Sequence, residues 1–446
     1  MIDRFRVALA SKIPQGSFAR NVVTLMTGTT FAQALAIIVA PILTRLYSPE
    51  DFGILAVFTS IVGILSVISC GRYEIAIVVA EDDEEASSLA VLALVLGIVF
   101  GITILILIII FKSWILTFNY KNIDMWIWIL PVSLTVMAIY QVLNYWNIRL
   151  QEYRLLAKRQ ISQSISTAMV QIGLSVLELA ERGLILGYVT GQCIATGMFL
   201  WQTIRTNWKS IVKKVTKEKL YRVLFKYKKF PLLDGWTSLL DNLTLAMPIL
   251  FFTYIYDSNI SGQLALTLKI LAIPSALIGV SVSQVYYQRL TLAIREGEGA
   301  SSIVEHTFAG LLGISICFCL LVVLVAPPLF PTVFGSSWVM AGQYARLLAP
   351  SICLRFVVSP LSSAFAAFNR LDLIALWKVI AVVITAGSLV LSIQFCNPTI
   401  SVVFFTISDI ALYCMYLIMI FKISKANITR SLTYSIRSLR KAYGNH

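Results

Sequence analysis

The feature that most constrains this chain is a series of long apolar runs. An α-helix rises 1.5 Å per residue, so crossing about 30 Å of hydrocarbon takes about 20 apolar residues. Breaks at charged or turn-forming residues divide the 446 residues into twelve such runs. The runs are longer than the ~10-residue strands of a membrane barrel and do not alternate strictly, which indicates helices. The predicted spans are 21–45, 53–79, 86–111, 123–148, 160–180, 183–204, 231–256, 262–288, 303–327, 339–368, 373–396 and 399–421.

Composition agrees with a polytopic membrane protein. Only 13% of the residues are charged and 58% are hydrophobic, against about 25% and ~45–50% in soluble domains. This excludes a soluble enzyme, a disordered chain and a secreted disulfide scaffold. The seven cysteines lie mostly in apolar runs, and there are only two histidines. We therefore expect no metal site and no cofactor, and the net charge of +14 does not indicate nucleic-acid binding.

The basic residues predict topology. An even number of spans places both termini on one side of the membrane. With the termini inside, cytoplasmic segments hold 27 Lys and Arg, outer loops hold four, and five lie within spans. This bias satisfies the positive-inside rule and predicts cytoplasmic termini. Residues 1–20 lack a signal-peptidase site and are predicted to form an interfacial segment.

Short matches between the two halves indicate an internal repeat. Ala-Pro-Ile-Leu at 40–43 recurs as Met-Pro-Ile-Leu at 247–250, and Ala-Ser-Ser-Leu at 86–89 recurs as Ala-Ser-Ser-Ile at 300–303. Pro131 pairs with Pro350. Each match is six spans apart, so the halves are expected to be parallel repeats. The predicted domains are an interfacial segment 1–20, an N-lobe 21–204, a basic linker 205–230, a C-lobe 231–421 and a basic tail 422–446.

Several motifs carry a family resemblance. They are Ala-Pro-Ile-Leu-Thr-Arg-Leu-Tyr-Ser-Pro-Glu-Asp-Phe-Gly (40–53), Gly-Arg-Tyr-Glu (71–74), Phe-Gly-Ser-Ser-Trp (334–338) and Leu-Ala-Pro (348–350). The chain resembles the polysaccharide exporters, the Wzx-type O-antigen flippases. The related lipid II flippases carry an arginine in the middle of the first helix. This chain has none between Arg20 and Arg45, which favours the polysaccharide branch.

The resemblance implies the multidrug/oligosaccharidyl-lipid/polysaccharide (MOP) exporter fold, with two six-helix lobes in a V around a central cavity. It implies no enzyme activity, but transport of an undecaprenyl-diphosphate-linked oligosaccharide, a repeat unit of O-antigen lipopolysaccharide or a similar polysaccharide. The substrate moves from the cytoplasmic to the periplasmic leaflet of the bacterial inner membrane. Membrane lipid, a polysaccharide polymerase and a chain-length regulator are the further partners expected. A drug or metabolite exporter of the same fold is the alternative, followed by a membrane polysaccharide polymerase.

A diphosphate needs cations in the cavity, and a charge within a span costs at least ~2.5–3.5 kcal/mol, so it usually has a function or a partner. Lys269 lies seven residues inside its span and precedes Pro274, where we expect a kink. The alternative for Lys269 is an ion pair with Asp241 or Asp234. The other candidates for phosphate binding are Arg72, Arg346, Arg355 and Lys378.

Each of these other cations has an alternative. Arg346 and Arg355 are nine residues apart and so lie on opposite faces of a straight helix, unless Pro350 bends it. Arg346, Lys378 and Arg72 could instead extend to the membrane surface. Arg72 and Glu74 are two residues apart and are expected to point to different faces, so that they are not simply each other's partner.

Four acids are candidates for coupling to H⁺ or Na⁺. Asp234 and Asp241 are seven residues apart and share a face of one span. Asp241 lies deeper, and its alternative is to neutralise Lys269. Asp409 and Glu74 are the other two candidates.

Three further patterns have two interpretations each. The polar and aromatic residues at 140–147 fit an interfacial belt better than a sugar path. The basic segment 205–229 is either an amphipathic helix on anionic lipid or a solvated linker. The Gly-x-x-x-Gly motifs at 97–101 and 187–191 fit helix packing within a lobe better than dimerisation.

Overall fold

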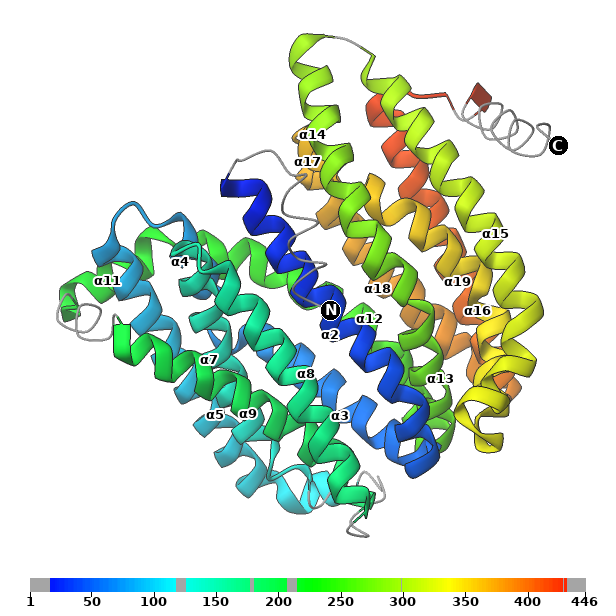
Figure 1. The fold of residues 1–446 in the computed structure, drawn as a ribbon, viewed down its shortest axis with the longest axis horizontal. Coiled ribbons are helices and arrows are strands. Elements are labelled where there is room, and N and C mark those ends of the chain that lie inside the picture. The colour runs from blue at the N-terminus through cyan, green and yellow to red at the C-terminus, as the bar shows by residue number, and fades with distance from the viewer. Residues whose placement is uncertain are drawn as a thin grey trace, which may run out of the picture. The chain divides into compact units, whose positions relative to one another are not determined.

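The computed structural model describes residues 17–117, 126–176, 180–206, 215–297, 299–427 and 429–430 (Figure 1). Most of the predicted interfacial segment 1–20 and most of the basic tail lie outside these residues, and residues 17–20 belong to the first described helix. Across the described residues every regular element is a helix. The predicted all-helical fold class is therefore confirmed.

Nine helical segments within the described part of the chain are long and apolar enough to cross a membrane. They are 27–46, 49–69, 83–112, 183–205, 230–255, 300–334, 336–367, 371–395 and 398–424. The other three predicted spans are also helical, but each differs from the prediction for a physical reason.

The first residues of the span predicted at 123–148 lie outside the described residues, and most of the rest forms α7 (Leu130–Arg149). The span predicted at 160–180 is α8 (Tyr153–Val176), which starts earlier and carries three cations in its first two turns. The span predicted at 262–288 is interrupted. It comprises α13 (Ser258–Leu271), a π-helix η2 (Ser275–Gly279) and α14 (Val280–Glu296). The break falls at Pro274, as expected for a residue that lacks a backbone donor and clashes with the preceding turn.

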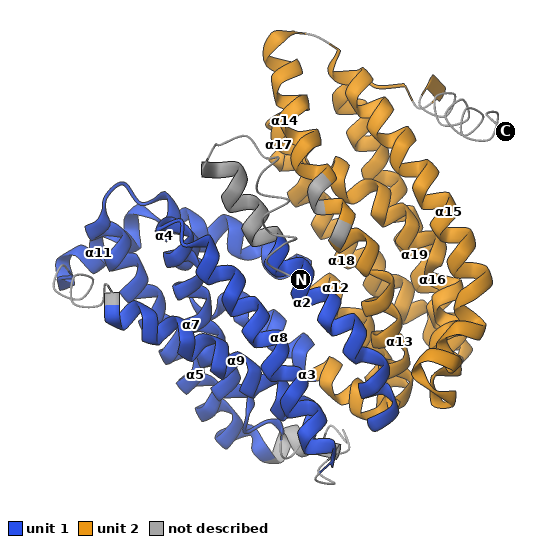
Figure 2. Cartoon of the chain, viewed as in Figure 1, with its two compact units in different colours: residues 1–47, 58–242 blue, residues 48–57, 243–446 orange. Residues whose placement is uncertain are grey.

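Contacts along the chain define two compact units. The first comprises residues 1–47 and 58–242, and the second comprises residues 48–57 and 243–446 (Figure 2). The divisions fall within α3 (Pro49–Ser69) and α12 (Gly235–Ile255), so each of these helices contributes to both units.

In the first unit, glycines allow close helix packing. This unit contains α2 (Ser17–Leu46), α4 (Tyr73–Val79), α5 (Asp83–Thr117), α9 (Ala180–Thr206) and α11 (Lys217–Lys226), besides α7 and α8. A Cβ on Gly187 or Gly191 of α9 would collide with Gln171 or Thr167 of α8. A Cβ on Gly97 of α5 would collide with Ala138 of α7. The predicted packing of both Gly-x-x-x-Gly motifs within a lobe is confirmed.

The second unit has a central helix that packs against two longer helices. In it α16 (Val339–Leu361) packs against both α15 (Ala300–Phe334) and α19 (Pro398–Ser424). The unit also contains most of α12, together with α13, η2, α14, α17 (Ala364–Ala367), α18 (Leu371–Ser392) and the 3₁₀ turns η3 (Ser336–Trp338) and η4 (Ile393–Phe395). The first turns of α3 also belong here, where the Phe52 ring lies edge-on to Trp338 at 5.0 Å.

The repeated motifs partly occupy equivalent places. Residues 86–89 lie at the start of α5 and residues 300–303 at the start of α15, and both helices are 35 residues long. Pro41 and Pro248 lie inside α2 and α12. The third match differs, because Pro131 lies at the start of α7 whereas Pro350 lies inside α16.

Candidate functional site

Two ion pairs within the helical body contain four of the nine candidate residues, and they lie in different units. In the first unit Arg72 pairs with Asp234. In the second unit Arg355 pairs with Asp409. Each pair joins helices that are far apart in the sequence.

A sharp turn places Arg72. The helix α3 ends at Ser69 and α4 begins at Tyr73. Between them, Gly71 and Arg72 have positive φ angles of 60° and 61°. Glycine accepts this left-handed conformation readily, whereas for arginine it costs roughly 1–2 kcal/mol. The predicted continuous span 53–79 is therefore broken at this turn.

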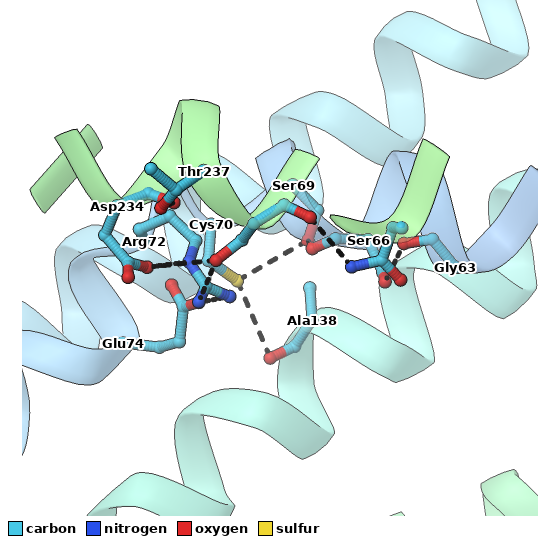
Figure 3. Close-up of polar contacts among 11 residues, drawn as sticks. Gly63, Ser66, Ser69, Cys70, Arg72, Glu74, Ala138, Asp234 and Thr237 are labelled. Atoms are coloured by element: carbon cyan, nitrogen blue, oxygen red, sulfur yellow. Dashed lines mark hydrogen bonds and ion pairs between the residues drawn. The ribbon is translucent and has the colours of Figure 1, made fainter. Parts of the chain in front are cut away.

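The turn brings Arg72 and Glu74 together. Because α4 starts after Arg72, the two residues do not lie on one continuous helix, and Arg72 Nη1 lies 3.6 Å from Glu74 Oε1. The prediction that they point to different faces is wrong for this reason, although Glu74 is not the sole partner of Arg72. Figure 3 shows Arg72 between Glu74 and Asp234.

Arg72 also donates two hydrogen bonds to the segment leading into α12. Its Nε donates to Asp234 Oδ2 at 2.6 Å, and its Nη2 donates to Ser238 Oγ at 3.0 Å. Asp234 ends the π-helix η1 (Phe230–Asp234), and Ser238 lies in the first turn of α12. Asp234, considered as a partner for Lys269, instead pairs with Arg72.

The two carboxylates around Arg72 differ in exposure. The Asp234 side chain is 42% exposed, whereas that of Glu74 is 1% exposed. Neither Glu74 oxygen accepts a hydrogen bond from a described residue. One guanidinium thus faces two carboxylates, and the buried one lacks the hydrogen bonds that usually accompany burial of a charge.

The second pair, in α16 and α19, also contains polar atoms that have no hydrogen-bond partner among the described residues. Arg355 Nη2 donates to Asp409 Oδ1 at 2.9 Å, and the guanidinium carbon lies 5.1 Å from the centre of the Tyr413 ring. Arg355 Nε and Asp409 Oδ2 are buried and form no hydrogen bond with any described residue. The pair therefore leaves one donor and one acceptor unsatisfied.

The other candidates are more dispersed. Lys269 of α13 and Arg346 of α16 have exposed side chains, while Asp241 of α12 and Lys378 of α18 are half-buried. Lys269 lies two residues before the end of α13, next to the break at Pro274. Pro350 does not end α16, which continues as one helix from Val339 to Leu361.

The basic segment 205–229 forms ion pairs with acidic residues between positions 81 and 85. Neither an amphipathic helix on lipid nor a solvated linker predicts these pairs. In α11, Lys219 Nζ lies 2.5 Å from Glu84 Oε2, and Lys226 Nζ lies 2.6 Å from Glu85 Oε1. Lys226 also contacts Glu81 at 3.1 Å. Its hydrogen bonds to Glu85 and then Glu81 raise the pKa of the Lys226 ammonium. We call these contacts the α11 latch.

One further buried arginine, Arg159, is not among the nine candidate residues. Arg159 precedes the predicted span 160–180, but it lies in the second turn of α8 and is only 7% exposed. Since α8 begins earlier than hydropathy predicts, the apolar run alone does not reveal this burial.

Comparisons with known proteins agree with this fold. The chain belongs to the polysaccharide biosynthesis protein family, whose model matches residues 42–343. No curated protein shows significant similarity to it.

Solved structures extend the likeness over nearly the whole chain. An inward-facing multidrug resistance MATE family transporter of the MOP superfamily is 15% identical, with a TM-score of 0.66, over 88% of this chain and 96% of that one. The lipid II flippase MurJ, in an inward closed conformation, is 14% identical, with a TM-score of 0.69, over 94% and 91%. The MATE transporter ClbM in complex with Rb⁺ is 15% identical, with a TM-score of 0.57, over 95% and 98%. The chain therefore has the same fold as these two transporters and this flippase.

Proposed function

We propose that this protein flips an undecaprenyl-diphosphate-linked oligosaccharide, the repeat unit of O-antigen or a similar polysaccharide. It moves this substrate from the cytoplasmic to the periplasmic leaflet of a bacterial inner membrane, with both termini cytoplasmic. Family membership and the MOP fold support a polysaccharide-related flippase. The observation that carries the proposal is an arginine–carboxylate pair within the helices of each unit that leaves hydrogen-bonding groups unsatisfied.

The arginines suit the diphosphate. A guanidinium presents a planar set of five donors that matches phosphate oxygens in pairs, and Arg355 uses only one of its donors on Asp409. Lys269, Arg346 and Lys378 are further cations that contact the substrate during its passage. A neutral or cationic drug has no need of such groups, which favours the lipid-linked substrate over the drug-exporter alternative.

The carboxylates supply ion coupling. When Asp409 is ionised it holds Arg355, and when it takes up a proton the guanidinium becomes free for phosphate. In the first unit Glu74 and Asp234 share Arg72, so the trio carries one excess negative charge that a proton or Na⁺ neutralises. Asp241 is a further carboxylate candidate. Substrate and ion thus compete for the same pairs, which links transport to an ion gradient.

Deletion in the host tests the function. Loss of the gene should make undecaprenyl-linked repeat units accumulate and remove surface polysaccharide. Complementation with the Arg355→Ala and Lys269→Ala variants should fail at wild-type membrane levels. Unchanged surface polysaccharide in the deletion strain would contradict the proposal.

A further inference from the structure

Arg159 differs from its neighbours on α8. Arg154 and Lys158 lie on the same two turns and are exposed, as expected for cations near a membrane surface. Arg159 is 7% exposed, and its guanidinium lies against Tyr140 and Phe199, which belong to a hydrophobic cluster with Leu143 and Leu155. Its long side chain therefore carries a positive charge into the interior of the first unit.

Two aromatic rings hold the guanidinium. Its carbon lies 4.0 Å from the centre of the Tyr140 ring of α7 and 5.7 Å from that of Phe199 of α9. The two rings are nearly parallel, with centroids 6.3 Å apart and planes at 10°. Contact with the face of a ring is electrostatically favourable but uses none of the N–H groups of an arginine.

Those N–H groups have no partner in the described part of the chain. Arg72, Arg149 and Arg355 each pair with a carboxylate there. No described carboxylate lies within ion-pair distance of Arg159, and no described residue accepts a hydrogen bond from it. Buried charges are normally paired, so an arginine that lacks a carboxylate among the described residues and is fixed between two rings is suited to bind an anion.

The helix α7, which carries Tyr140, also lies near the residues that follow Arg72. Tyr145 of α7 packs against the cluster of buried residues that contains Tyr73, the residue after Arg72. Between Tyr140 and Tyr145, the Gln141 side-chain oxygen is buried and accepts no hydrogen bond from a described residue. The cytoplasmic half of α7 thus presents polar groups between two arginines of one unit.

We infer that Arg159 binds phosphate oxygens of the lipid-linked substrate, with Tyr140 and Phe199 fixing the plane of its guanidinium. This inference rests on the proposed function and adds a binding residue to it. It also changes the interpretation of the polar residues at 140–147, whose tyrosine at position 140 supports a substrate-binding arginine in addition to any role at the membrane surface.

Binding of undecaprenyl diphosphate to the full chain in phosphatidylcholine nanodiscs tests the inference. Arg159→Met keeps the length and apolar contacts of the side chain but removes its donors. Since a hydrogen bond to a charged group contributes roughly 1.5–3 kcal/mol, we expect affinity to fall about 10-fold or more. Arg154→Met, the exposed control on the same helix, should bind as wild type does, and both variants should unfold at the wild-type temperature.

The outcomes separate the two proposals. Wild-type protein that fails to bind undecaprenyl diphosphate contradicts the proposed function itself. Wild-type affinity in Arg159→Met overturns only the role of Arg159. If Arg159→Met does not fold, Arg159→Gln keeps a polar side chain but removes the charge, and wild-type affinity in that variant overturns the inference equally.

Two further probes identify the source of the phosphate. Inorganic pyrophosphate should compete with undecaprenyl diphosphate in the wild type and about 10-fold more weakly in Arg159→Met, where the other cations remain. Equal competition in both proteins would overturn the role of Arg159. Phosphatidylglycerol added to the nanodiscs should not compete at equal concentration. Displacement by phosphatidylglycerol would show an ordinary lipid-headgroup site and overturn the assignment to the substrate.

Discussion

The Arg355–Asp409 pair gives the most discriminating test of whether these charges serve structure or transport. The Asp409 side chain is 7% exposed and that of Arg355 is 29% exposed. Removing one partner from a buried pair costs about 3–5 kcal/mol, and the single hydrogen bond here puts the expectation near ~3 kcal/mol. Arg355→Met and Asp409→Leu should each lower the free energy of unfolding by this amount.

The double variant should behave differently. With both charges gone no unpaired ion is left, so we expect a loss of about 1 kcal/mol or less. Unfolding of the purified protein in mixed micelles, followed by tryptophan fluorescence, measures all three variants. Losses that add to within ~0.5 kcal/mol would refute the coupling.

The same double variant separates stability from function. If the pair is only structural, restoring stability should restore polysaccharide export. If Arg355 binds phosphate and Asp409 binds the coupling ion, the double variant should fold at wild-type membrane levels and export nothing. Export near the wild-type level in cells would remove the pair from the mechanism.

Three further predictions concern other parts of the chain. Glu74→Gln should abolish the response of transport to an imposed pH gradient, because the amide cannot take up a proton; an unchanged response in vesicles would exclude Glu74 from coupling. Gly191→Val should destabilise the protein by about 1–3 kcal/mol because its side chain collides with α8. Gly197→Val on the same helix has open space and should cost less in the same unfolding assay. In the α11 latch, Lys226→Glu should detach the helix and expose it to proteolysis, and adding Glu85→Lys should restore protection; cleavage of the double variant at the rate of the single variant would contradict the ion pair. Because Glu85 raises the pKa of Lys226 and Lys226 lowers the pKa of Glu85, the latch should persist at neutral pH. It should weaken as the pH rises above the ordinary pKa of a lysine or falls below the ordinary pKa of a glutamate.

The helical fold follows from the sequence because residence in a membrane imposes one rule on each segment separately. A run of apolar residues must satisfy its own backbone, and that requirement is visible without any knowledge of its neighbours. Intramembrane charges are visible for the same reason, since their cost depends on their own position in a span. This is why Arg72, Arg355 and Asp409 could be named in advance.

The pairings could not be predicted, because they depend on which helices pack together. The turn at Gly71 and Arg72 lies within a continuous apolar pattern, so periodicity extends the span through it and separates Arg72 from Glu74. Arg159 was missed because hydropathy places the start of its helix too late. Among these unpredicted features, only the α11 latch has a signal in the sequence. The acidic residues at 81–85 and the basic segment 205–229 both lie on the predicted cytoplasmic side.

Translocation in reconstituted vesicles addresses the proposed mechanism most directly. Fluorescent undecaprenyl-diphosphate oligosaccharide is placed in proteoliposomes under a pH gradient, and its transfer between leaflets is followed by a quencher that cannot cross the bilayer. Wild-type protein should accelerate transfer, and the stable Arg355→Met/Asp409→Leu variant should not. No acceleration by the wild type, or equal acceleration by both, would contradict transport through the paired charges.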